Sequence, residues 1–143
     1  MKTLISLVLY TLSFAPLLGQ IQVDGMPQSA ANIMFRQQES WNAGDLEGFM
    51  LGYWNSDNLL FIGGSGVTSG YDATLERYLK GYPDKESMGH LVFTNRSWTP
   101  LGRNYALLVG EWRLGEDVGG MYSLVWHKIK REWLIIADHS SSE

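Results

Sequence analysis

Apolar side chains recur at helical spacing in the first half of the chain and at strand spacing in the second half. The spacing over residues 28–43 predicts a helix, with Ser29 as its N-cap and an apolar face made of Ala30, Ile33, Met34, Gln37 and Trp41. Gly44 ends this helix, and Asp45 can cap a second helix that carries Leu46, Phe49, Met50 and Tyr53. A third helix is predicted over residues 71–80, before Pro83.

Strand patterns follow the helices. Residues 59–62 form a short apolar strand, and a glycine-rich stretch comes after it. Four longer strands are predicted at about 89–98, 104–114, 120–130 and 132–140. The connections between them are short, which favours antiparallel hairpins. Helices first and strands afterwards is an α+β order, and no repeat or linker divides it.

The predicted strands are apolar on both faces. Strict alternation in the last strand puts Leu134, Ile136, Asp138 and Ser140 on the inward side, and Trp133, Ile135, Ala137 and His139 on the other. Helices can cover only one face of such a sheet. We therefore expect a homodimer through the outer sheet face, with a patch made of Leu107, Val109, Val125 and Ile135.

The first twenty residues have the layout of a secretory signal peptide. Lys2 precedes an uncharged, mostly apolar run that extends from Leu4 to Gly19. This run is short for a membrane span, which needs about 20 residues. We expect cleavage near Gly19 or Gln20. The sequence thus predicts an exported protein, periplasmic or secreted, without a stable membrane anchor.

Composition narrows the function. The 143 residues suit one signal peptide (1–20) and one domain (21–143), and they include 6 Trp, 7 Tyr and 5 Phe. So many aromatic side chains predict a large core, an aromatic-lined cavity, or both. The net charge of −4 argues against a nucleic-acid partner. Cysteine is absent and there are only three histidines, so we predict neither a metal site nor a cofactor.

Several segments together resemble the nuclear transport factor 2-like superfamily, in its SnoaL-like branch. They include Trp41-Asn42-Ala43-Gly44-Asp45, Gly110-Glu111-Trp112-Arg113-Leu114, Ser123-Leu124-Val125-Trp126, and the closing segment from Trp133 to Ser141. Their order and spacing carry the resemblance, which covers residues 28–141. It implies a cystatin-like cone, in which a bent antiparallel sheet is wrapped by about three N-terminal helices around an apolar cavity. Many members pair through the outer sheet face.

Asp138 and Tyr53 are the candidate catalytic residues. Asp138 lies in an apolar strand, where lost hydration would raise the pKa of a general acid or base. The resemblance implies the same, because SnoaL-type cyclases carry an acid–base aspartate on a late strand. Tyr53 can point its phenol into the cavity as an oxyanion donor. The alternatives are a structural carboxylate for Asp138 and core packing for Tyr53.

The candidate ligand-binding residues are Trp112, Tyr122, Trp126, Ser140 and His90. The three aromatic residues could line the pocket, although such rows on strands also build cores. Ser140 shares the inward side with Asp138. His90 lies where a strand begins near the cone mouth, and a solvated histidine is the alternative.

Three function classes remain open, because the fold does not fix the function. The first is a module that binds a small apolar molecule in the cavity. The second is a cofactor-free acid–base enzyme, such as an isomerase, cyclase or dehydratase, which uses Asp138. The third is a homo-oligomeric interaction domain whose cavity is vestigial and filled by side chains. Whether the protein is an enzyme is therefore left open.

Overall fold

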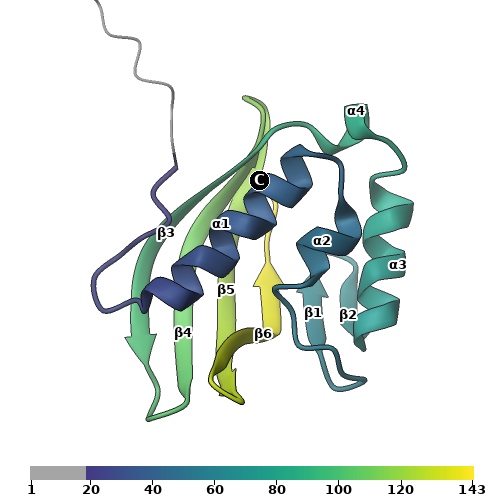
Figure 1. The fold of residues 1–143 in the computed structure, drawn as a ribbon. Helices are drawn as coiled ribbons and strands as arrows, with labels where there is room; N and C mark the ends of the chain where they lie inside the picture. The colour runs from purple at the N-terminus through teal and green to yellow at the C-terminus, as the bar shows by residue number, and fades with distance from the viewer. Residues whose placement is uncertain (1–18) are drawn as a thin grey trace, which may run out of the picture.

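A six-stranded curled sheet with helices against its concave side forms the fold, seen in a computed structural model that describes residues 19–143 (Figure 1). Most of the predicted signal peptide lies outside the described residues. The elements in order are α1 (Gln28–Asn42), α2 (Leu46–Met50), β1 (Leu60–Gly63), β2 (Gly66–Ser69), α3 (Tyr71–Gly81), α4 (Lys85–Met88), β3 (Leu91–Pro100), β4 (Tyr105–Leu114), β5 (Val118–Ile129) and β6 (Glu132–Ser140). No described helix has both the length and the apolar content to cross a membrane. This α+β architecture confirms the predicted fold class.

The sheet has the order β2-β1-β6-β5-β4-β3. The last four strands form three consecutive antiparallel hairpins, as predicted. The pairing of β1 with β6 is parallel, which the sequence did not suggest. It brings a strand from the middle of the chain beside the last strand, so Phe61 lies next to Asp138.

The helix ends follow local chemistry. Asp45 caps α2 as expected, since its Oδ1 accepts the Gly48 N–H at 2.8 Å. The expected Ser29 cap is wrong. The cap position of α1 is Pro27, and no side chain satisfies the first N–H groups there. Helix α4 and strand β2 were not predicted, because segments of four residues are too short to show a period.

Two irregularities in strand pairing bend the sheet. The register of β3 against β4 shifts between Asn95 and Ser97, and that of β5 against β6 shifts between Val125 and Trp126. The second shift leaves Ile136 as an extra residue in β6. Strict alternation therefore fails along β6. Of the predicted inward residues, Asp138 and Ser140 lie on the concave side, whereas Leu134 and Ile136 do not line it. Ile135 is inward and only 1% exposed.

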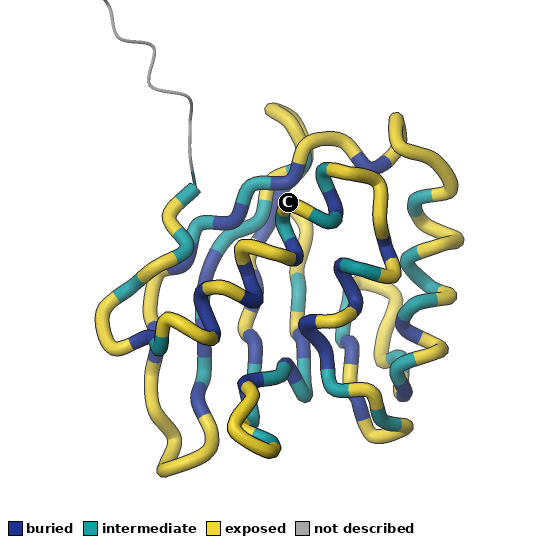
Figure 2. The backbone as a smooth tube through the Cα atoms, viewed as in Figure 1, coloured by how far each residue is buried: buried dark blue, intermediate teal, exposed yellow. Residues whose placement is uncertain are grey.

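The core lies between the concave sheet face and the helices (Figure 2). Helix α1 crosses the sheet and covers the strands from β3 to β6 (Figure 1). Its predicted apolar face is buried throughout. Helices α2 and α3 close the side above β1 and β2. Because α1 does not fill the space beside them, the concave side keeps an internal cavity.

Candidate functional site

A cavity of about 110 Å³ lies between the sheet and helices α1, α2 and α3. Nine of its lining residues are aromatic: Trp41, Phe49, Tyr53, Phe61, Tyr78, Tyr82, Phe93, Trp112 and Tyr122. The others are Met34, Gln37, Leu91, Leu114, Leu124, Ile135, Asp138 and Ser140. Most lining residues are buried, whereas five are half-buried: Tyr78, Tyr82, Trp112, Leu114 and Ser140. We call Tyr82, Trp112, Leu114 and Ser140 the rim. The site is thus an aromatic chamber with one carboxyl group.

The bulge in β6 places that carboxyl group. Trp126 pairs with Ile135, and Leu124 pairs with Asp138, so Ile136 and Ala137 of β6 lie opposite the single residue Val125 of β5. Both Ile135 and Asp138 consequently face the core. Asp138 is 3% exposed, and its neighbour His139 lies exposed on the opposite face.

Asp138 is held by hydroxyl groups on both sides. The Tyr53 hydroxyl donates to Asp138 Oδ2 at 2.6 Å, and the Ser140 hydroxyl donates to Asp138 Oδ1 at 2.6 Å. The Tyr78 hydroxyl lies 3.4 Å from the Tyr53 hydroxyl and extends the chain of polar groups. We call these four residues the Asp138 cluster.

Backbone pairing holds Tyr53 beside β6. Tyr53 follows α2, and a single parallel bridge joins it to Ile135. The Trp54 N–H donates to the Ile135 carbonyl at 2.9 Å, and the Ile135 N–H donates to the Gly52 carbonyl at 3.0 Å. The cap of α2 and this bridge therefore fix the direction of the phenol toward Asp138.

Burial sets the protonation of the cluster. Loss of hydration raises the pKa of Asp138, and the hydrogen bonds from Ser140 and Tyr53 and the nearby His139 only partly oppose it. Burial, followed by the Asp138 charge, raises the pKa of Tyr53 and of Tyr78 well above the ordinary phenol value. Both phenols stay protonated, so Asp138 is the member that changes charge first as the pH varies.

The structure brings most of the predicted site residues to the cavity. Tyr53, Asp138 and Ser140 meet in one cluster, and Trp112 and Tyr122 line the wall. The Tyr122 hydroxyl is turned away, because it donates to Asn95 Oδ1. The ring of Tyr122 therefore contributes an apolar surface, and its path across β4 requires the glycine at position 110.

Two predicted ligand-binding residues lie elsewhere. Trp126 is fully buried in the core against Trp98, with ring centroids 5.8 Å apart, and is not part of the cavity wall. His90 is exposed just before β3 and does not line the cavity, which agrees with the solvated alternative.

Gln37, Tyr78 and Tyr82 line the cavity but were not among the predicted site residues. A signal existed for Gln37, since a polar residue interrupts the apolar face of α1. It is 2% exposed, and its Nε2 donates to the Phe49 carbonyl at 3.1 Å. Gly52 makes room for it, because a Cβ there would lie 2.5 Å from Gln37 Cδ. Tyr78 was interpreted as part of the apolar side of the third helix, and Tyr82 lay beyond the predicted end of that helix.

Residues 19–143 contain no group of three His, Cys, Asp or Glu side chains that could hold a metal ion. The polar atoms of the cavity are also few. The arrangement can bind a compact molecule against aromatic rings, and it can exchange a proton at Asp138.

Known structures share this architecture. A nuclear transport factor 2-like protein of unknown function from Shewanella oneidensis MR-1 is 39% identical, with a TM-score of 0.75, over 80% of this chain and 97% of that one. A ketosteroid isomerase-like protein from Erwinia carotovora atroseptica is 13% identical, with a TM-score of 0.62, over 84% and 98%. A nuclear transport factor 2-like superfamily protein from Salmonella enterica is 20% identical, with a TM-score of 0.61, over 80% and 88%.

The last two likenesses show the fold alone. No protein-family model and no curated protein match the chain.

Proposed function

Because the chain belongs to the nuclear transport factor 2-like family, we propose that its conical fold serves to bind a small, mostly apolar molecule. The observation that carries this proposal is the open chamber, which is aromatic on nearly all sides and holds one buried carboxyl group. Rings supply contact area, and a few polar groups orient the ligand. The interaction-domain alternative expects a filled cavity, and the open volume of about 110 Å³ argues against it.

The size of the chamber limits the ligand. Its volume of about 110 Å³ is below the roughly 150 Å³ of an apolar cavity that accommodates benzene. Pockets for drug-sized ligands span roughly 300–1,000 Å³. The part of a ligand that the chamber encloses is therefore no larger than one small ring or a short branched chain, and any larger ligand would have to extend past the half-buried residues.

A second candidate function is acid–base catalysis without a cofactor. The contact of 2.6 Å between the Tyr53 hydroxyl and Asp138 favours it, since burial raises the pKa of this carboxyl toward the range a general base needs. Each carboxylate oxygen already accepts one hydroxyl hydrogen. A substrate would have to displace one of them before Asp138 could take its proton. For this reason we rank catalysis second.

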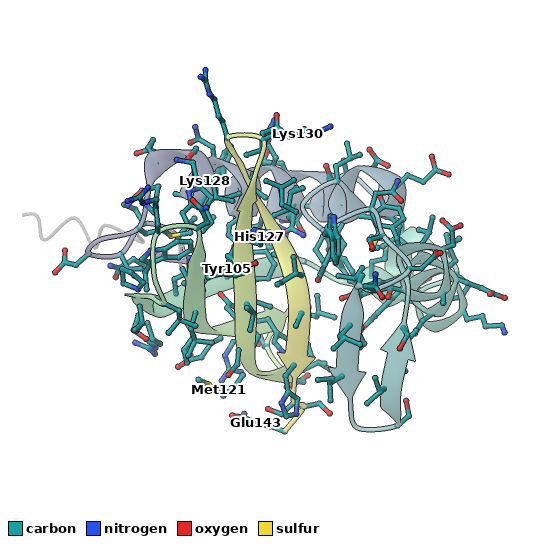
Figure 3. The ribbon with its side chains drawn as sticks, turned by 90° about the horizontal axis from the view of Figure 1, so that it is seen from below. Tyr105, Met121, His127, Lys128, Lys130 and Glu143 are labelled. Carbon is teal, nitrogen blue, oxygen red and sulfur yellow. The ribbon has the colours of Figure 1, made fainter. Side chains whose placement is uncertain are left out.

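We also propose that the domain acts after export and as a homodimer. The outer face of β4, β5 and β6 carries half-buried Leu107, Val109, Val125 and Ala137. Tyr105 and Met121 lie near opposite ends of this face and are 42% and 38% exposed (Figure 3). Ile135 was predicted to be part of this outer patch, but it is buried in the core instead. A partner's matching face would cover the remaining apolar surface.

The test of the binding function uses single-ring probes. Phenol, benzyl alcohol and cyclohexanone are titrated into the protein, and binding is followed by tryptophan fluorescence and NMR shifts. At least one probe should bind, and Asp138→Asn should change its affinity. Asp117→Asn is the matched control, because it removes an exposed carboxylate in the turn between β4 and β5. Probe turnover that Asp138→Asn abolishes would favour the enzyme. Absence of binding by every probe would refute the binding of an uncharged single-ring molecule.

A further inference from the structure

Any charge that the lining side chains of the aromatic chamber carry is negative. Asp138 is the only charged side chain among the lining residues, and no lysine, arginine or histidine from residues 19–143 lines the cavity. Nine aromatic rings surround this carboxyl group. We infer that the cavity binds a small organic cation, an ammonium group whose charge is covered by alkyl substituents. This inference rests on the proposed binding function and names its ligand class.

Aromatic rings attract cations through the negative potential of their faces, and several rings together form the cages that bind quaternary ammonium groups. Several ring pairs of the lining meet at steep angles, although Tyr78 and Tyr82 are stacked at 26°. Trp41 lies at 68° to Phe49 and at 74° to Tyr82, and Phe49 lies at 72° to Tyr78. Rings at such angles enclose a ligand from several directions rather than stacking on one side.

The hydrogen-bond pattern of the Asp138 cluster also favours a cation. With Asp138 ionised, the hydroxyl hydrogens of Tyr53 and Ser140 both point to it. The Tyr78 hydroxyl can donate to Tyr53. The cluster then has no O–H left to donate to a ligand carbonyl or anion. A quaternary ammonium group needs no donor, and it leaves these hydrogen bonds intact while it compensates the buried negative charge.

One cation of the protein already lies against a wall of the chamber. The Arg77 guanidinium stacks on the Phe61 ring, with Cζ 4.9 Å from the ring centroid. Arg77 is half-buried on α3 and does not line the cavity. The Phe61 ring thus already binds a cation by this contact. Within the part of the chain that the structure describes, no side-chain cation pairs with Asp138.

Size is compatible with this class. The volume of about 110 Å³ is below that of a benzene-binding cavity, and a trimethylammonium group has fewer heavy atoms than benzene, so the chamber can enclose the charged group. The half-buried rim of Trp112, Leu114, Tyr82 and Ser140 is where a longer substituent could leave the chamber.

The deciding experiment compares a cation with its uncharged isostere. Choline and 3,3-dimethylbutan-1-ol have the same shape and hydroxyl group, but the second has carbon in place of the ammonium nitrogen. Calorimetric titration of the protein should give choline at least about a tenfold tighter Kd. Asp138→Asn should remove most of this preference, and Tyr82→Leu should reduce it. Tyr105→Leu, which changes an exposed tyrosine of the outer face, should leave the preference unchanged.

The outcomes separate the two proposals. Equal or tighter binding of the uncharged isostere would overturn the inference and leave the binding function standing. Tighter binding of phenol than of choline would overturn it as well. Failure of choline, the isostere and the single-ring probes alike would refute the binding function itself. Circular dichroism and the denaturation midpoint of each variant show that it is folded, so a loss of binding can be assigned to the site.

Discussion

Removal of the Tyr53 hydroxyl should change the unfolding free energy by an amount that depends on whether Asp138 is ionised. In Tyr53→Phe the 2.6 Å hydrogen bond to Asp138 Oδ2 is lost, together with the weaker contact to Tyr78 at 3.4 Å. A hydrogen bond between neutral groups contributes about 0.5–1.5 kcal/mol, and one to a charged group about 1.5–3 kcal/mol. The cost of the substitution should therefore depend on whether Asp138 is ionised.

The sign of the pH dependence follows from burial. Burial raises the pKa of Asp138 in the folded protein above its unfolded value, which is near 3.9. This group therefore contributes stability that is fully present below pH ~4 and is lost as the pH rises through the folded pKa. The Tyr53 hydrogen bond lowers that pKa, so Tyr53→Phe should raise it further. If the pKa of Asp138 rises by one unit, the substitution lowers the unfolding free energy by about 1.4 kcal/mol more at high pH than at low pH.

Urea unfolding followed by tryptophan fluorescence, at several pH values between 4 and 9, measures this difference. The gap in unfolding free energy between the protein and Tyr53→Phe should widen by about 1 kcal/mol from low to high pH. Tyr122→Phe is the matched control, since its buried hydroxyl donates to the amide of Asn95 and its cost should not vary with pH. A constant gap for Tyr53→Phe, with an unchanged carboxyl titration of Asp138 by NMR, would refute the reasoning.

Three further predictions follow from other parts of the molecule. Gly110→Ala should destabilise the fold by about 1–3 kcal/mol in urea unfolding, because its Cβ would lie 2.5 Å from the Tyr122 hydroxyl oxygen; an unchanged midpoint would contradict this packing. Val109→Glu should convert a dimer into monomers in light scattering, since it places a charge in the outer face, and a wild-type monomer at micromolar concentration would end the dimer proposal. Mass spectrometry of the protein from its native host should find a chain that starts near residue 20 or 21, and recovery of an intact Met1 would refute export.

The sequence by itself determined the elements whose signals are local. Helical spacing located α1 and α3 to within a few residues, and Asp45 marked the start of α2. Short turns between apolar runs gave the three hairpins of β3 to β6. The outer sides of β4 and β5, with Leu107, Val109 and Val125, also followed, because alternation along those two strands is unbroken and their pairing is in register.

Tertiary structure decided the site. The extra residue at Ile136 puts Ile135 and Asp138 on one face, and a bulge depends on pairing with β5 rather than on the sequence of β6 alone. The sequence suggested Asp138 and Tyr53 as a catalytic pair, although they are 85 positions apart. The parallel bridge between Tyr53 and Ile135 brings the Tyr53 hydroxyl to 2.6 Å from Asp138 Oδ2. Trp112 and Trp126 look equivalent in the sequence, yet Trp126 is fully buried against Trp98 and Trp112 is half-buried at the cavity. Local patterns encode the period of each element, whereas the cavity arises from how distant elements meet.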